Sequence, residues 1–168
     1  MTRMSLVPMV VALALVACDF QHTAATVQWG GYTFQEVRAL AGLPPTIKST
    51  LGVGRPGLDG VADRGQSFNV TDMVDDRVPM RRLLSAGRDG DNWIVAIERG
   101  GRGYSVEVFL FSAHEAAPKQ TWVLRDLGDR PTTLAQVVQQ MVRWGHGMKA
   151  NPRLQRPALR AAAEPPGR

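Results

Sequence analysis

The run between Arg81 and Asp126 constrains the fold most, because extended segments and turn-forming residues alternate along it. Four segments that read as strands follow one another, at residues 83–87, 93–98, 104–112 and 121–125. An Asp-Gly pair separates the first two, and three glycines between residues 100 and 103 separate the second from the third. Connections of this length join antiparallel neighbours, so we predict an antiparallel meander of three to four strands.

The third of these segments indicates how the sheet is covered. Val106, Val108 and Leu110 share one face of a strand at this position, whereas Phe109 and Phe111 lie on the other face. A strand that is apolar on both faces is typical of a sheet covered on both sides. We therefore expect one end of the sheet to be buried on both faces.

A C-terminal helix is predicted from about Thr133 to Trp144. Thr133 is a favourable N-cap, and Gln136, three residues later, completes a capping box. Five apolar residues recur at helical spacing and form one stripe: Leu134, Val137, Val138, Met141 and Val142. We expect this stripe to pack on the sheet.

An N-terminal helix is predicted for residues 33–41 by the same reasoning. Thr33 and Glu36 have capping-box spacing, and Gly42 with the Pro44-Pro45 pair follows as a helix stop. The apolar residues at helical spacing are Phe34, Val37, Leu40 and Ala41. The predicted fold class is therefore α+β, with the meander packed against an N-terminal and a C-terminal helix.

The remaining segments show no clear periodicity. Residues 46–67 are rich in glycine and are expected to form a long surface loop. Residues 69–76 are expected to form a short acidic helical turn capped by Thr71. The predicted organisation is a signal segment at 1–17, a tether at 18–28, a single α+β domain at 29–148 and a basic tail at 149–168.

The first residues resemble the leader of a bacterial lipoprotein. Arg3 precedes an uncharged apolar run of 14 residues from Met4 to Ala17, shorter than the roughly 18–20 residues that span a bilayer. The run ends in Leu15-Val16-Ala17-Cys18, which resembles the lipobox read by prolipoprotein diacylglyceryl transferase and signal peptidase II. The resemblance implies cleavage between Ala17 and Cys18 and lipidation of the Cys18 thiol. The alternatives are an ordinary cleaved signal and an uncleaved anchor.

Lipidation would fix the protein to a membrane, with its domain facing the periplasm. Each buried methylene contributes ~0.8 kcal/mol, so two or three acyl chains make a durable anchor. Asp19 directly follows the cysteine and resembles the signal that retains enterobacterial lipoproteins in the inner membrane, which we therefore favour over the outer one. Cys18 is the only cysteine, which excludes disulfides and thiolate metal clusters from the mature domain, and we expect no cofactor.

The positive charge of the chain is concentrated at its C-terminal end. Between Asp19 and Met148, 14 Lys and Arg residues balance 14 Asp and Glu residues, so the predicted domain is neutral. The tail has a surplus of basic residues, for which we predict contact with anionic lipid or cell-wall polymer: Lys149, Arg153, Arg156 and Arg160. A neutral domain with a basic tail, in an envelope location, argues against nucleic acid as a partner.

Several groups of residues have the composition of a site, each with a simpler interpretation. Gly52, Gly54 and Gly57 satisfy G-x-G-x-x-G, but without a preceding strand a flexible loop is preferred over a dinucleotide site. Three aspartates between residues 72 and 76 could surround a cation, or could pair with neighbouring arginines. Residues 89–92 resemble part of a calcium loop, but they also have the composition of a hairpin turn.

His114 is the best candidate for acid–base or nucleophilic chemistry. It follows an apolar segment and has Glu115 and Ser112 as sequence neighbours, although no triad motif surrounds these residues. The alternative is an exposed histidine beyond a strand. An envelope hydrolase with a site near His114 is therefore the alternative to a binding protein.

Residues 31–44 resemble a family motif. Gly31-Tyr32-Thr33-Phe34-Gln35-Glu36-Val37, continuing to Gly42-Leu43-Pro44, resembles the helix motif G-x-T-x-x-x-V-x-x-x-x-G-x-P of the SmpA/OmlA outer-membrane-assembly lipoproteins. The resemblance implies a helix-plus-sheet scaffold whose exposed face docks on partner proteins. About fifty residues separate Pro44 from Trp93, where the family has a short link, and no binding residue is carried over. The features together favour a membrane-anchored, non-enzymatic binding or assembly module whose partner is another envelope protein.

Overall fold

The structure, a computed structural model, describes residues 25–125 and 127–145. Within these ranges the elements follow one another as β1 (Thr26–Trp29), β2 (Tyr32–Val37), the 3₁₀ turn η1 (Leu40–Gly42), α1 (Pro45–Leu51), the 3₁₀ turn η2 (Gly57–Asp59), β3 (Val61–Ala62), β4 (Arg81–Asp89), β5 (Asn92–Arg99), β6 (Ser105–Ser112), β7 (Gln120–Arg125) and α2 (Leu134–Gly145).

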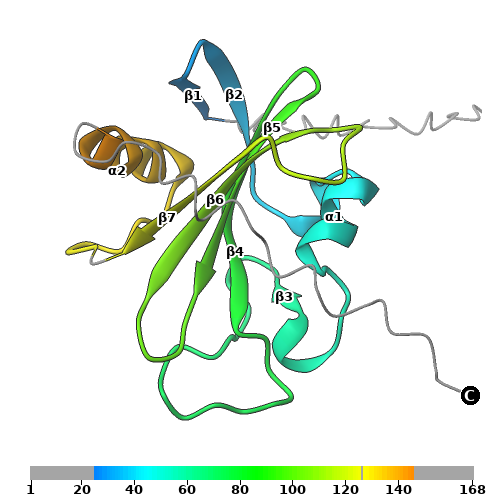
Figure 1. Ribbon diagram of the computed structural model, residues 1–168, viewed down its shortest axis with the longest axis vertical. Coiled ribbons are helices and arrows are strands. Elements are labelled where there is room, and N and C mark those ends of the chain that lie inside the picture. Colours follow the sequence, from blue (N-terminus) through cyan, green and yellow to red (C-terminus); the bar gives the residue numbers. More distant parts are fainter. Residues whose placement is uncertain (1–24, 126, 146–168) are drawn as a thin grey trace, which may run out of the picture.

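The strands form one curled sheet with α1 on one side and α2 on the other (Figure 1). Six strands run antiparallel in the order β1-β2-β4-β5-β6-β7, and β3 pairs in parallel with the start of β4. The edge strands β1 and β7 approach each other, since the rings of Trp29 and Trp122 lie 5.1 Å apart in an edge-to-face contact. The sheet is therefore a half-barrel that is concave on the α2 side.

This architecture corrects the predicted fold class. The four predicted strands are present as β4 to β7, but they belong to a larger half-barrel, so a three- to four-stranded meander between two helices is wrong. The helix predicted for residues 33–41 is not formed, nor is the helix that the family resemblance implied there. Strand β1 begins at Thr26, so residues 26–28, assigned to the predicted tether, are part of the sheet.

Strand β2 takes the place of the predicted N-terminal helix because pairing satisfies its backbone on both sides. It lies between β1 and β4, with Phe34 opposite Val27 and Glu36 opposite Gly87. Phe34 and Glu36 are buried whereas Gln35 between them is exposed, which is the alternation of a strand. Thr33 does not cap a helix, and its backbone N–H donates to the Asp89 carboxylate at 3.0 Å.

The predicted glycine-rich loop contains a helix of its own. Pro45 occupies the first turn of α1, where its missing N–H costs nothing, so the Pro44-Pro45 pair starts a helix instead of only ending one. Ile47 and Leu51 are buried one turn apart, and Gly52 ends the helix in the left-handed conformation at φ 82°. The predicted helical turn at residues 69–76 is also wrong, because residues 71–73 form a bend and no helix is present between residues 69 and 76.

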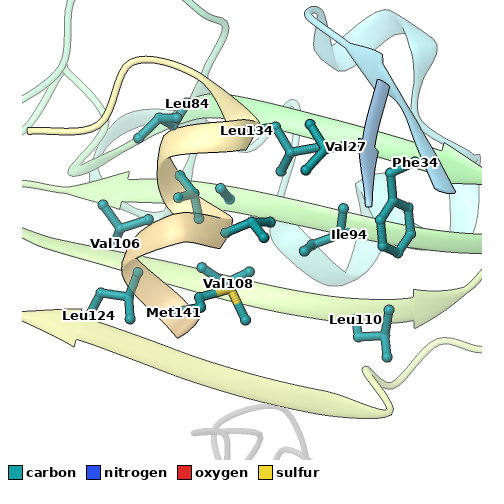
Figure 2. Close-up of a cluster of buried hydrophobic side chains, with 13 residues drawn as sticks. Val27, Phe34, Leu84, Ile94, Val106, Val108, Leu110, Leu124, Leu134 and Met141 are labelled. Carbon is teal, nitrogen blue, oxygen red and sulfur yellow. The ribbon is translucent and has the colours of Figure 1, made fainter. Parts of the chain in front are cut away.

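Two apolar clusters cover the two faces of the sheet, as the third predicted segment indicated. The cluster on the concave face joins α2 to the strands, and Figure 2 shows Leu134 of α2 beside Val27 of β1 and Met141 of α2 beside Val108 of β6. The second cluster lies on the convex face beneath α1 and includes Ile47. Both clusters consist of residues from the described part of the chain.

Helix α2 confirms the C-terminal prediction and its cap. The Gln136 N–H donates to the Thr133 hydroxyl at 3.3 Å, while the Gln136 side chain accepts from the Thr132 N–H at 2.8 Å instead of from Thr133. Val142, assigned to the apolar stripe, is 46% exposed and lies at the margin of the packed face. Among the described residues, neither helix has the length and apolar character needed to cross a bilayer.

Candidate functional site

Most site residues predicted from sequence lie outside the described ranges. The cleavage and lipidation positions Ala17 and Cys18 and the sorting position Asp19 precede residue 25. The basic tail positions also lie outside: Lys149, Arg153, Arg156 and Arg160. A candidate site in the folded domain is therefore built from other residues.

His114 lies in an exposed loop after β6. Its side chain is 78% exposed, and its Nε2 lies 3.5 Å from a carboxylate oxygen of Asp91, which is itself 70% exposed. An exposed pair of this kind contributes little free energy because water and salt screen it. Within the described residues no hydroxyl or carboxylate hydrogen-bonds to His114, and the Glu115 N–H donates to the Ser112 carbonyl instead. The geometry offers no nucleophile–base pair at this position.

Of the three aspartates between residues 72 and 76, Asp75 serves local structure. The Asp75 carboxylate accepts from the Arg77 guanidinium at 2.9 and 3.0 Å, and hydrogen bonds from Arg77 hold the pKa of Asp75 at about 2. Buried Asn69 closes this loop by donating to the carbonyls of Asp75 and Val78. In the described part of the chain, no group of three or more His, Cys, Asp or Glu side chains is placed to hold a metal ion.

The glycine motif after α1 also has a structural explanation. Gly52 caps α1, and its N–H donates to the Ser49 carbonyl at 3.2 Å. Gly54 and Gly57 likewise have positive φ angles, of 85° and 59°. A helix precedes the motif where a dinucleotide site requires a strand, so the three glycines shape a chain reversal.

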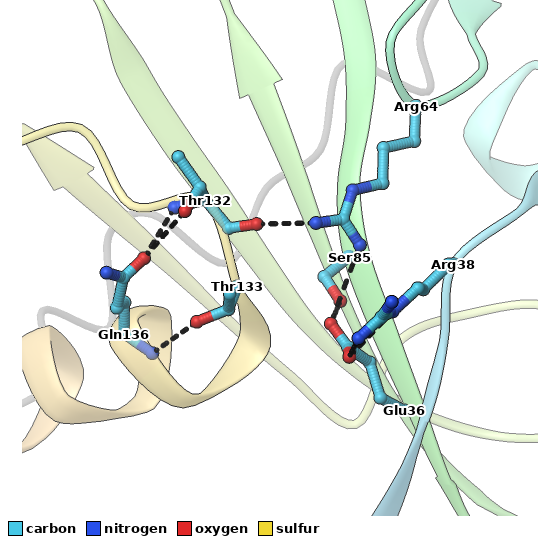
Figure 3. A network of polar contacts seen from close by, with 7 residues as sticks. All are labelled: Glu36, Arg38, Arg64, Ser85, Thr132, Thr133 and Gln136. Atoms are coloured by element: carbon cyan, nitrogen blue, oxygen red, sulfur yellow. Dashed lines mark hydrogen bonds and ion pairs between the residues drawn. The ribbon is translucent and has the colours of Figure 1, made fainter. Parts of the chain in front are cut away.

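A buried carboxylate organises the polar end of the concave face (Figure 3). Glu36 of β2 is 3% exposed in its side chain, accepts from the Ser85 hydroxyl at 2.8 Å, and pairs with Arg38 at 2.9 Å and Arg64 at 3.6 Å. Burial alone would raise the pKa of Glu36, but these partners outweigh it and hold the pKa below its ordinary value. Arg64 also donates to the Thr132 carbonyl ahead of α2, so the network ties three segments together and serves stability.

A second carboxylate is engaged in the same way. Glu98 of β5 accepts from Arg82 at 2.7 Å and from the Tyr104 hydroxyl at 3.3 Å. Burial and the neighbouring Glu98 charge raise the pKa of Tyr104. The Arg130 guanidinium lies 4.5 Å from the Tyr104 ring centre, and Arg82 lies 4.3 Å from that of Phe68. The side chains of Glu98, Arg82 and Tyr104 therefore provide hydrogen-bond partners for one another.

The convex face carries a different arrangement, a row of arginines that runs across the sheet. Arg81 of β4 lies opposite Arg99 of β5, Arg99 lies opposite Ser105 of β6, and Ser105 lies opposite Arg125 of β7. Residues in register share a face, so the three arginines point to the same side as α1. We call Arg81, Arg99 and Arg125 the arginine row.

The arginine row is only partly neutralised. Arg99 lies 3.7 Å from Glu107 with its side chain 52% exposed, while the Arg81 guanidinium donates to the Asp59 carbonyl at 2.6 Å. Burial lowers the pKa of Arg81, and the nearby charge of Arg99 adds to that effect against the opposing influence of Glu107. Arg125 is exposed and forms no hydrogen bond or ion pair with any residue that the structure describes.

Such a row can bind anions. Guanidinium groups donate two parallel hydrogen bonds to phosphate or carboxylate oxygens, and they stay protonated at any physiological pH. Directly opposed like charges destabilise a sheet, so Arg81 opposite Arg99 is costly without an anion. This surface is the best candidate functional site in the folded domain.

Sequence reasoning missed the arginine row because register was unknown. Arg81, Arg99 and Arg125 are each separated by 18 or more residues, and no local motif joins them. A β-bulge between Leu83 and Ser85 shifts the β4–β5 register by one residue, which sets Arg81 opposite Arg99. The one available signal was an arginine at, or within two residues of, one end of three predicted strands.

Comparison of the chain with known protein families, with curated proteins and with solved structures finds no match.

Proposed function

We propose that this protein is a lipid-anchored component of the bacterial cell envelope whose β-domain faces the periplasm and binds a partner without transforming it. The observation that carries the proposal is the lipobox-like Leu15-Val16-Ala17-Cys18, which ends seven residues before Ala25. Lipidation of Cys18 would therefore hold the half-barrel close to the membrane, since seven residues span at most ~25 Å. The partner that we favour is another envelope component.

The folded domain supports binding over catalysis. The arginine row lies on strands of a sheet that has an apolar cluster on each face. The packed sheet holds the backbone of these arginines in place before a partner binds. The best acid–base candidate, His114, lacks a hydrogen-bonded nucleophile in the described residues. A hydrolase near His114 is therefore not favoured by any observed geometry.

Intact-mass analysis of protein made in a bacterium with normal lipoprotein processing tests the anchor. We expect the chain to begin at Cys18 and to carry the added mass of acyl chains. Cys18→Ser is expected to lose that mass, whereas Ala17→Gly is a matched control that keeps a small residue before the scissile bond and is expected to retain it. A wild-type product that keeps Met1, or one with a free thiol and no lipid, would overturn the proposal.

The membrane that holds the protein is a separate test. Asp19 directly follows the lipidated position and favours retention in the inner membrane. We expect wild-type protein in the inner-membrane fraction and Asp19→Ser protein shifted to the outer-membrane fraction after density-gradient separation. The same distribution for both variants would show that Asp19 has no role in sorting.

A further inference from the structure

The shape and charge of the arginine row restrict which ligands can bind it. Four arginines surround this part of the convex face: Arg55, Arg81, Arg99 and Arg125. A Cβ added at Gly52 would lie 3.2 Å from the Arg81 Nη2 and 3.3 Å from the Arg55 Cδ, so these two side chains lie close together beside Gly52. Two acidic residues, Glu107 and Asp59, oppose them electrostatically. With four arginines against two acidic residues, this part of the surface has a net positive charge.

The row lies on the face of a sheet and is extended. Neighbouring strands are ~4.8 Å apart, so Arg99 and Arg125, two strands from each other, present their charges about 10 Å apart. Small molecules are usually held in concave sites that surround them. Arg99 and Arg125 are exposed. Their guanidinium groups are better matched by an extended surface that repeats an anion, and phosphodiesters accept their paired hydrogen bonds.

The position of the row is compatible with the membrane that the anchor would provide. The Ala25 carbonyl accepts from the Glu36 N–H, and Glu36 lies opposite Gly87. The first described residue is therefore level with the C-terminal part of β4. Arg81 is six residues further along β4, which corresponds to ~20 Å in a strand. Cys18 and Ala25 are seven positions apart and so at most ~25 Å from each other, which lets an anchored Cys18 and the row reach one membrane plane.

We propose that the arginine row binds the phosphate groups of anionic phospholipids in the membrane that holds the anchor, and thereby docks the convex face of the half-barrel on the bilayer. This proposal rests on the lipid anchor of the proposed function. It assigns a membrane contact to the folded domain, distinct from the basic tail.

Arginine footprinting on full-length lipidated protein tests the docking. The protein is reconstituted in vesicles of phosphatidylcholine alone, or with phosphatidylglycerol, and arginines are modified with phenylglyoxal and mapped by mass spectrometry. We expect Arg99 and Arg125 to be protected at least fivefold by phosphatidylglycerol, and to lose that protection at high salt. Arg143, exposed on α2, is the internal control and is expected to react equally in both vesicles.

Single substitutions make the test quantitative. A basic side chain near an anionic surface contributes about fivefold to binding. Arg125→Gln is therefore expected to weaken the protection of Arg99 about fivefold, and Arg99→Gln that of Arg125. Arg143→Gln is the matched control and is expected to leave both protected. These side chains are exposed, and far-UV circular dichroism verifies that each variant is folded.

The outcomes separate the two proposals. Equal labelling of the row in both vesicles overturns the docking, even if the protein floats with them. Equal protection by inorganic phosphate in neutral vesicles also overturns it, because the ligand would then be a free anion. Failure to float with neutral vesicles, together with an unlipidated mass, overturns the anchor. Protein added from solution to phosphatidylglycerol vesicles then still decides the docking by protection of Arg99.

Discussion

Replacing Gly87 with alanine tests how closely α2 packs into the half-barrel. Gly87 is buried on β4, where an added Cβ would lie 2.6 Å from Leu134 Cδ2, 2.7 Å from Phe34 Cβ and 3.2 Å from Ile94 Cγ2. Leu134 can give way by changing rotamer, but the Phe34 Cβ is fixed to the backbone of β2. The methyl group therefore has to displace either the strand or the helix.

The magnitude follows from two opposing effects. Overpacking a core costs about 1–3 kcal/mol, while replacing glycine restricts the unfolded chain and recovers about 0.4–1 kcal/mol. We expect Gly87→Ala to lower the free energy of unfolding by about 1–2 kcal/mol, which corresponds to a Tm roughly 4–8 °C lower. Urea and thermal denaturation measure both quantities.

Two further variants show whether the loss comes from this contact. Gly103→Ala is the matched control, because nothing lies within 4 Å of its added Cβ, and we expect it to unfold no earlier than wild type. Leu134→Ala opens space beside Gly87, so the double variant should be more stable than the sum of the single losses predicts. A Gly87→Ala protein as stable as wild type would refute the packing of α2 over β4.

Four other perturbations have expected outcomes. Glu36→Gln should lower the free energy of unfolding by about 1–3 kcal/mol at pH 7, because Arg38, Arg64 and Ser85 lose a buried charged partner. Folding lowers the pKa of Glu36, so the difference in unfolding free energy between wild type and variant should shrink as the pH falls below about 4.5. A difference that stays constant from pH 7 to pH 3 would contradict this. Thr133→Ala should cost about 1 kcal/mol of unfolding free energy, measured in urea, by removing the α2 cap. Asn69→Ala should increase amide exchange at residues 75–78, which its side chain holds; unchanged exchange would contradict that role. Deleting residues 150–168 should weaken salt-sensitive binding to anionic vesicles, and equal binding at low salt would dismiss the tail.

The strands that sequence predicted correctly depend on short-range signals. The continuous apolar run of β5, the partial alternation of β6 and the turn at Gly90, which adopts φ 56°, act over a few residues. The cap at Thr133 is equally local. These features could be predicted because neighbouring residues contain all the information that decides them.

The segment at residues 33–41 misled the prediction because a polar residue faces inwards. Glu36 occupies a buried position, so the strand pattern was broken and the helical spacing of apolar residues remained. Its burial is tolerated because Arg38, Arg64 and Ser85 satisfy it. Two of these partners lie 28 and 49 residues away in the chain, beyond the reach of any local pattern.

The candidate site shows the same division. The sequence by itself determined that arginines stand at or close to the ends of three predicted strands, and that a lipobox-like segment precedes the domain. Only the tertiary structure decided that Arg81, and not its neighbour Arg82, faces Arg99, because the β4 bulge sets the register. Arg82 pairs with Glu98 as a result. Features that depend on neighbouring residues can be read from the sequence. Which residues of different strands lie opposite each other is decided only when the sheet forms.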